Sequence, residues 1–63
     1  MRIMGHKGDL SINKITLSLK INLDMPVDEA RQIAINIRDG LIVDLPYDMV
    51  LIEDLQDMGI LVQ

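Results

Sequence analysis

The stretch Ile15-Thr16-Leu17-Ser18-Leu19-Lys20-Ile21-Asn22-Leu23-Asp24 alternates apolar and polar residues without interruption. Successive side chains of a β-strand point to opposite faces of a sheet, so all the apolar residues of this stretch would lie on one face. The period of two predicts a half-buried strand. In such a strand Leu17, Leu19 and Ile21 belong to the core, whereas polar residues between them, such as Ser18, face solvent.

Upstream of this stretch the alternation changes phase. Leu10 and Ile12 occupy even positions, whereas the apolar residues from Ile15 onward occupy odd ones. A two-residue turn at Asn13-Lys14 would restore the phase and place both sets on one face of a paired sheet. We therefore predict an antiparallel β-hairpin over residues 4–23. A β-bulge at the same place is the alternative left open, because lysine suits the second turn position less well than glycine.

A helix is predicted over residues 26–38. Asp24 or Met25 would cap it, Pro26 fits the first helical turn, and Gly40 lies just past its end. The predicted buried face consists of apolar residues at helical spacing: Val27, Ala30, Ile33, Ala34 and Ile37, with Leu41 as an optional last member. We expect this face to pack on the apolar face of the hairpin.

A second helix is predicted over residues 48–58, with Asp48 as its cap and Gly59 at its end. Residues 41–46 are a short apolar run that can be a strand or an extended connector. Residues 60–62 are either a last short strand or an apolar tail docked on a partner. The sequence therefore predicts an α+β fold, in which the hairpin is covered by two helices.

The length of the chain limits it to a single small domain, residues 1–63. A chain of 63 residues buries only about 60% of the surface that it exposes when unfolded, so its stability should be marginal. Disulfides and a structural zinc site are the usual reinforcements, but the chain has no cysteine and one histidine, which predicts neither. Since 49% of the residues are hydrophobic, we expect the surplus to be covered in a homodimer.

The sequence predicts neither a membrane span nor a signal peptide. No apolar stretch approaches the roughly 20 residues that a transmembrane helix needs. The basic start of the chain is followed by Gly5 and His6 and not by an apolar segment. Together with the absence of cysteine, this favours a cytoplasmic protein without membrane contact.

Nothing in the sequence indicates an enzyme, a cofactor or a metal ion. His6 is the only histidine, and no serine, cysteine or aspartate stands near it in a pattern that would orient a general base. The flanking glycines, Gly5 and Gly8, lack the spacing of a phosphate-binding loop. A substrate pocket of several hundred cubic ångströms is also hard to build in so small a fold.

Charge is distributed unevenly along the chain. Residues 1–38 contain six Lys or Arg and four Asp or Glu, whereas residues 39–63 contain six Asp or Glu and no basic residue. In a helix over residues 48–58 several of these acids would be three or four positions apart, and each like-charge pair at that spacing costs about 0.2–0.5 kcal/mol. The residues predicted to bind a partner are Asp44, Asp48, Glu53, Asp54 and Asp57.

Two interpretations of this acidic segment remain open, a solvated face and a contact surface for a basic protein. The leading hypothesis is a small non-enzymatic binding protein or inhibitor whose carboxylates occupy a basic surface, such as one that binds nucleic acid. The alternative is a structural or assembly subunit that oligomerises through aliphatic surfaces. With a net charge of −4 and no basic patch, direct binding of nucleic acid is not expected.

Overall fold

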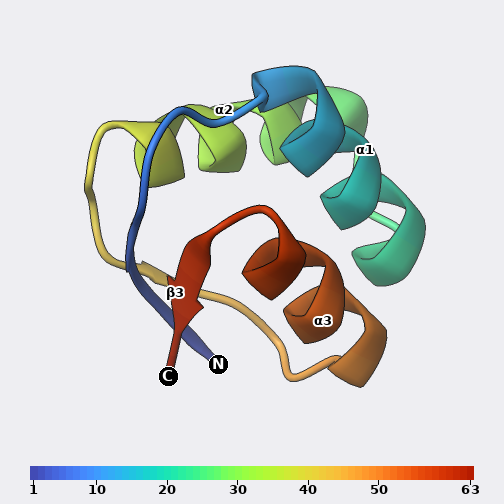
Figure 1. Cartoon of the computed structure of the whole chain (residues 1–63). Coiled ribbons are helices and arrows are strands. Elements are labelled where there is room, and N and C mark those ends of the chain that lie inside the picture. Colours follow the sequence, from blue (N-terminus) through green and yellow to red (C-terminus); the bar gives the residue numbers. More distant parts are fainter.

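The structure, a computed structural model, describes residues 1–63 and has an α+β fold. Its elements in chain order are β1 (Arg2–His6), α1 (Ile12–Leu23), α2 (Val27–Arg38), β2 (Val43–Asp44), α3 (Met49–Asp57) and β3 (Ile60–Val62) (Figure 1). The three strands form an antiparallel sheet in the order β2-β1-β3. The predicted α+β fold class is confirmed, but the first half of the chain forms other elements than those predicted.

The predicted hairpin over residues 4–23 is wrong, because residues 12–23 form helix α1. Ser11 caps this helix, and its hydroxyl accepts a hydrogen bond from the Lys14 amide at 3.3 Å. Asp24 ends the helix in the left-handed conformation, with φ 50° and ψ 39°. The positions expected to form the hairpin turn or the bulge thus lie in the first turn of α1.

The alternating pattern is explained by two apolar stripes that interleave on one helix. Ile15, Leu19 and Leu23 are four residues apart and lie on one face, since residues four apart in a helix are neighbours. Ile15 and Leu19 are fully buried on that face. Leu17 and Ile21 form the second stripe, and they are 57% and 68% exposed. Of the three residues predicted as core, only Leu19 is correct.

The helix predicted over residues 26–38 is confirmed as α2, with Ala30, Ala34 and Ile37 buried as expected. Val27 and Leu41, which were predicted to continue this buried face, are instead 51% and 54% exposed. The N-terminal cap of α2 is Pro26 and not Asp24 or Met25, because Asp24 already ends α1.

The helix predicted over residues 48–58 is confirmed as α3. It begins at Asp48, whose carboxylate oxygen Oδ1 accepts a hydrogen bond from the Leu51 amide at 2.8 Å. It ends at Asp57, and Gly59 follows its C-terminal cap Met58. Gly59 has a φ of 86°, and a Cβ atom there would lie 3.0 Å from the carbonyl oxygen of Lys7. None of the three helices has the length and apolar composition needed to cross a membrane.

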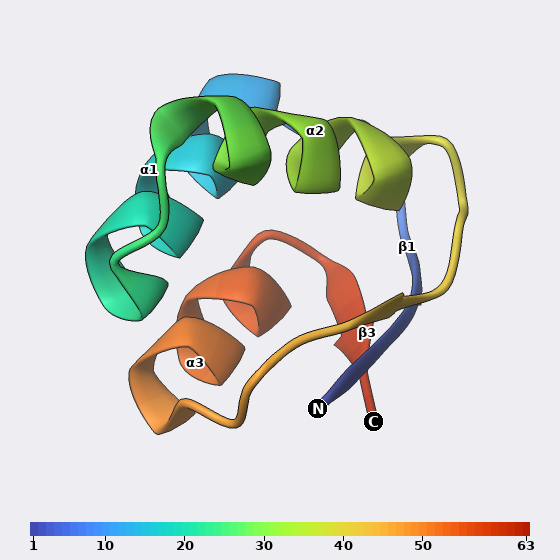
Figure 2. The ribbon, with the colours of Figure 1, turned by 180° about the vertical axis from the view of Figure 1, so that it is seen from behind.

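The sheet joins the two ends of the chain. Residues 41–46 contain the short strand β2, and residues 60–62 form β3, so both ambiguous runs contribute strands. Strand β1 pairs with both of them, and its register toward β3 shifts between Ile3 and Gly5. Figure 2 shows both termini at this sheet. A pairing between residues so far apart leaves no local signal in the sequence.

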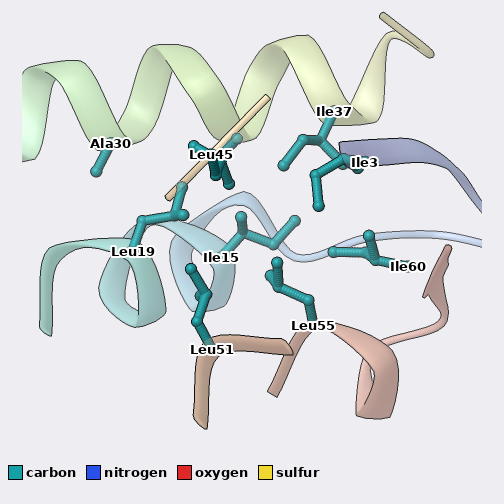
Figure 3. Close-up of a cluster of buried hydrophobic side chains, with 10 residues drawn as sticks. Ile3, Ile15, Leu19, Ala30, Ile37, Leu45, Leu51, Leu55 and Ile60 are labelled. Atoms are coloured by element: carbon teal, nitrogen blue, oxygen red, sulfur yellow. The ribbon is translucent and has the colours of Figure 1, made fainter. Parts of the chain in front are cut away.

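The core lies between the three helices and the sheet (Figure 3). Its ten buried residues are Ile3, Ile15, Leu19, Ala30, Ala34, Ile37, Leu45, Leu51, Leu55 and Ile60. Helix α1 packs against both α2 and α3, whereas α2 and α3 do not approach each other closely. Helices α1 and α3 run in opposite directions, side by side, in Figures 1 and 2. Helix α1 is therefore the central helix.

Candidate partner-binding site

An open groove of about 390 Å³ runs between α1 and α3. Its lining residues are Lys14, Leu17, Ser18, Ile21 and Asn22 of α1, and Val50, Asp54 and Met58 of α3. Because the two helices run in opposite directions, the end of α1, which contains Ile21, lies beside the start of α3, which contains Val50. The groove therefore follows about two turns of each helix.

The walls of the groove are exposed and aliphatic. Leu17 and Ile21 form one wall, and Val50, which is 57% exposed, belongs to the other. Isolated exposed aliphatic residues are ordinary, but a contiguous set around a hollow marks a contact surface. The local stability of α1 does not require these residues, since the buried stripe through Leu19 already anchors the helix. Apolar residues placed on a solvent face against the amphipathic pattern are expected at functional sites.

The middle of the groove is polar. Half-buried Asp54 accepts hydrogen bonds through Oδ2 from the Ser18 hydroxyl at 3.0 Å and from the Asn22 side-chain nitrogen at 3.3 Å. Asn22 also donates to the Ser18 carbonyl at 2.9 Å. The second carboxylate oxygen of Asp54, Oδ1, makes no hydrogen bond within the protein. An oriented carboxylate between aliphatic walls can therefore accept a hydrogen bond from a cationic group of a partner.

Ser18 had been expected to face solvent, but it is only 7% exposed. Helical geometry places it beside Ile15, which is three positions away, and hence against α3. Its hydroxyl is satisfied by Asp54, as a buried polar group requires.

Two of the five predicted partner-binding residues have roles within the fold. Asp44 forms an ion pair with Arg2, with 2.9 Å between Nε and Oδ1. The hydrogen bond from Arg2 lowers the pKa of the Asp44 carboxyl, with a smaller contribution from the positive charge of Arg2. Asp48 caps α3. Neither residue belongs to the groove.

The other three predicted residues, Glu53, Asp54 and Asp57, are brought together by α3. Glu53 and Asp57 are exposed, four positions apart, and neither forms an ion pair. Asp57 follows Asp54 by three positions, so the two are neighbours on the surface of the helix. Of these three acids only Asp54 lines the groove. We call Glu53, Asp54 and Asp57 the acidic face of α3.

Sequence reasoning missed the aliphatic half of this site. It placed Leu17 and Ile21 in the core and gave Val50 no role. The available signal was the spacing of Leu17 and Ile21, which is four residues and out of phase with the buried stripe. That signal was hidden because the two stripes together produce a period of two.

A second hollow, of about 310 Å³, lies beside β3, and its lining residues are Lys7, Gln56, Gly59, Ile60, Leu61 and Val62. It holds one basic side chain and no carboxylate. Elsewhere the ring of His6 lies between two backbone carbonyl oxygens, 2.8 Å from that of Gly8 and 3.0 Å from that of Arg38. His6 thus links β1 to the end of α2.

No group of three or more His, Asp or Glu side chains is arranged to hold a metal ion. The groove between α1 and α3 is therefore the site that combines a hollow, exposed aliphatic walls and carboxylates without an ion pair. Comparisons of this chain with protein families, with characterised proteins and with solved structures found no match.

Proposed function

We propose that this chain is a small non-enzymatic binding protein that presents the acidic face of α3 to a basic partner protein. The observation that supports this most directly is the position of Glu53 and Asp57. They are exposed, carry no ion pair, and belong to the same helix as Asp54, which lines a groove with aliphatic walls. A charged rim around an apolar centre is the usual composition of a protein–protein contact.

The acidic face works against the stability of its own helix. Like charges four positions apart, as in Glu53 and Asp57, cost about 0.2–0.5 kcal/mol. Helix α3 has no basic residue in its last turn, where Asp57 meets the negative end of the helix dipole. The protein's basic residues do not compensate, since its two ion pairs join Arg2 to Asp44 and Arg38 to Asp39. A function outside the fold accounts for such an arrangement.

A basic partner fits this surface best. Residues 39–63 carry no positive charge, so their field attracts cations over about one Debye length, which is about 8 Å at physiological ionic strength. Such attraction speeds the encounter of two proteins. One form of this function is occupation of the surface with which the partner binds nucleic acid. Duplex DNA would then compete with this protein for the partner.

The proposal is tested by neutralising two carboxylates that have no structural role, Glu53→Gln together with Asp57→Asn. Wild-type and variant protein are immobilised and exposed to extract of the native cell at about 50 and 300 mM salt, where screening lengths differ roughly twofold. We expect the wild type to retain basic proteins at low salt and the variant to retain several-fold less. Bound proteins are quantified by mass spectrometry.

The matched control is Asp28→Asn with Glu29→Gln, which removes the same charge from α2. Both residues are exposed, and α2 does not approach α3 closely. Loss of retention in the α3 variant but not in this control supports the proposal. Equal retention by all three proteins at both salt concentrations means that the acidic face is only a solvated surface.

A second candidate is a structural or assembly subunit, and exposed aliphatic residues outside the groove favour it. Leu41 and Ile42 are 54% and 62% exposed in the connection to β2. Contacts through such residues persist as salt rises, since no charge is screened. Retention of other proteins that is the same at both salt concentrations would identify this function.

A further inference from the structure

We propose that the groove between α1 and α3 seats an amphipathic helix of the basic partner. Aliphatic residues of that helix would lie between the walls, and one of its Lys or Arg residues would bind Oδ1 of Asp54. This inference rests on the proposed function and adds to it a specific site, a conformation of the bound segment and a pattern of recognised residues.

The spacing of the walls fits a helix. Leu17 and Ile21 are one helical turn apart, so they present two aliphatic side chains about 6 Å apart along the groove. Val50 and Met58 on the facing helix span two turns. Helices bind in such grooves through residues at positions i, i+4 and i+7. The groove length of about two turns, near 12 Å at 1.5 Å per residue, calls for a partner helix of about three turns.

The charges in the groove indicate where the partner helix carries a cationic side chain. Asp54 lies in the middle of the groove, fixed by Ser18 and Asn22, and offers an oxygen without a partner. Lys14 lines the same groove and lies toward Met58, so it repels a basic residue at that end. A bound helix should therefore place a cationic side chain at Asp54 and keep its cationic side chains away from Lys14.

A second copy of this chain fits the groove less well. In a two-fold contact both copies use the same patch, so a patch that includes the acidic face of α3 and a single basic side chain, Lys14, would bring an excess of carboxylates together. Like charges placed opposite each other in an interface oppose association. The net charge of −4 adds to this repulsion. A basic helix in the groove avoids this repulsion and supplies a hydrogen-bond donor for Asp54.

The test uses a synthetic peptide of 14 residues that carries Leu at positions i, i+4 and i+7 and Lys beside this stripe. A scrambled peptide of identical composition cannot form an amphipathic helix and serves as the reference. Binding is measured by calorimetry, and the site is mapped from backbone amide resonances. We expect the amphipathic peptide to bind at least tenfold more tightly and to shift the resonances of Leu17, Ile21, Val50 and Asp54.

Variants separate the groove from the acidic face. The double substitution Leu17→Ser with Ile21→Ser should lower the affinity for the amphipathic peptide at least tenfold at both low and moderate salt. Val27→Ser with Leu41→Ser is the matched control, because these residues are also about half exposed but lie outside the groove. Its affinity should stay within twofold of the wild type. Helical circular dichroism of both variants shows that the fold is kept.

The outcomes distinguish failure of this inference from failure of the proposed function. In one outcome the Leu17/Ile21 variant binds the peptide as tightly as the wild type does, while neutralising Glu53 and Asp57 lowers the affinity for the peptide. The groove inference is then wrong, but the acidic face still binds. Failure of the amphipathic peptide to bind better than the scrambled one also overturns the inference. A sedimentation experiment can also overturn the inference. If the wild type is a dimer and the Leu17/Ile21 variant is a monomer, the occupant of the groove is a second copy.

Discussion

Burial separates residues of α1 that look equivalent in the sequence. Leu19 is fully buried, whereas Leu17 is 57% exposed. We therefore expect Leu19→Ala to lower the free energy of unfolding by about 2–5 kcal/mol, which is a large part of the stability of so small a domain. Leu17→Ala should change it by less than about 0.5 kcal/mol. Urea unfolding followed by circular dichroism measures both values, and equal losses would contradict the orientation of α1.

The ion pair between Arg2 and Asp44 predicts a pH effect. Because the hydrogen bond from Arg2 lowers the pKa of Asp44 in the folded protein, the pair contributes stability above the carboxyl's unfolded-state pKa. This contribution is lost as the pH falls through the folded-state pKa. Both side chains are exposed, so the effect on stability is small.

The more sensitive measurement of this pair is the titration of Asp44 itself. We expect Arg2→Gln to raise the pKa of the Asp44 carboxyl toward its ordinary value, because the charged hydrogen-bond donor is lost. Carboxyl carbon resonances followed by NMR between pH 2 and 7 report this directly. An unchanged titration curve would mean that the pair does not form in solution.

At the scale of secondary-structure elements, the end of α1 distinguishes a helix from a strand. Asp24 has a φ of 50°, a conformation that glycine adopts freely and that costs most other residues roughly 1–2 kcal/mol. We expect Asp24→Gly to leave stability unchanged or to raise it, and Asp24→Val to lower it by about 1–2 kcal/mol. An extended strand at this position would reverse the order, since strands favour valine over glycine. Thermal unfolding of the two variants gives the answer.

At the scale of the whole molecule, the small core predicts self-association. Only 12 of the 63 residues are buried, no disulfide reinforces the fold, and several large aliphatic side chains outside the groove remain exposed. We expect sedimentation at micromolar concentration to give a mass above the 7.1 kDa of one chain, because association stabilises a marginal fold. A monomer of high stability at all concentrations would contradict this expectation.

The sequence by itself determined the two helices in the second half of the molecule. The cap at Asp48 and the stops at Gly40 and Gly59 are local features, and an apolar stripe at helical spacing completes each of helices α2 and α3. Such signals depend on residues close in the chain, so they can be read without knowledge of the fold. The excess of carboxylates after residue 38 likewise indicated Glu53 and Asp57 as candidate contact residues.

Only the tertiary structure decided the first half and the groove. The run from Ile15 to Leu23 satisfies a period of two and, through two interleaved stripes, a period of four. Packing resolves this ambiguity, because residues 60–62 pair with β1 and α3 supplies Asp54 as the partner of Ser18. These contacts join residues 36 or more positions apart, and such contacts leave no mark in a local pattern. For the same reason the groove between α1 and α3 could not be predicted, although the acidic face of α3 could.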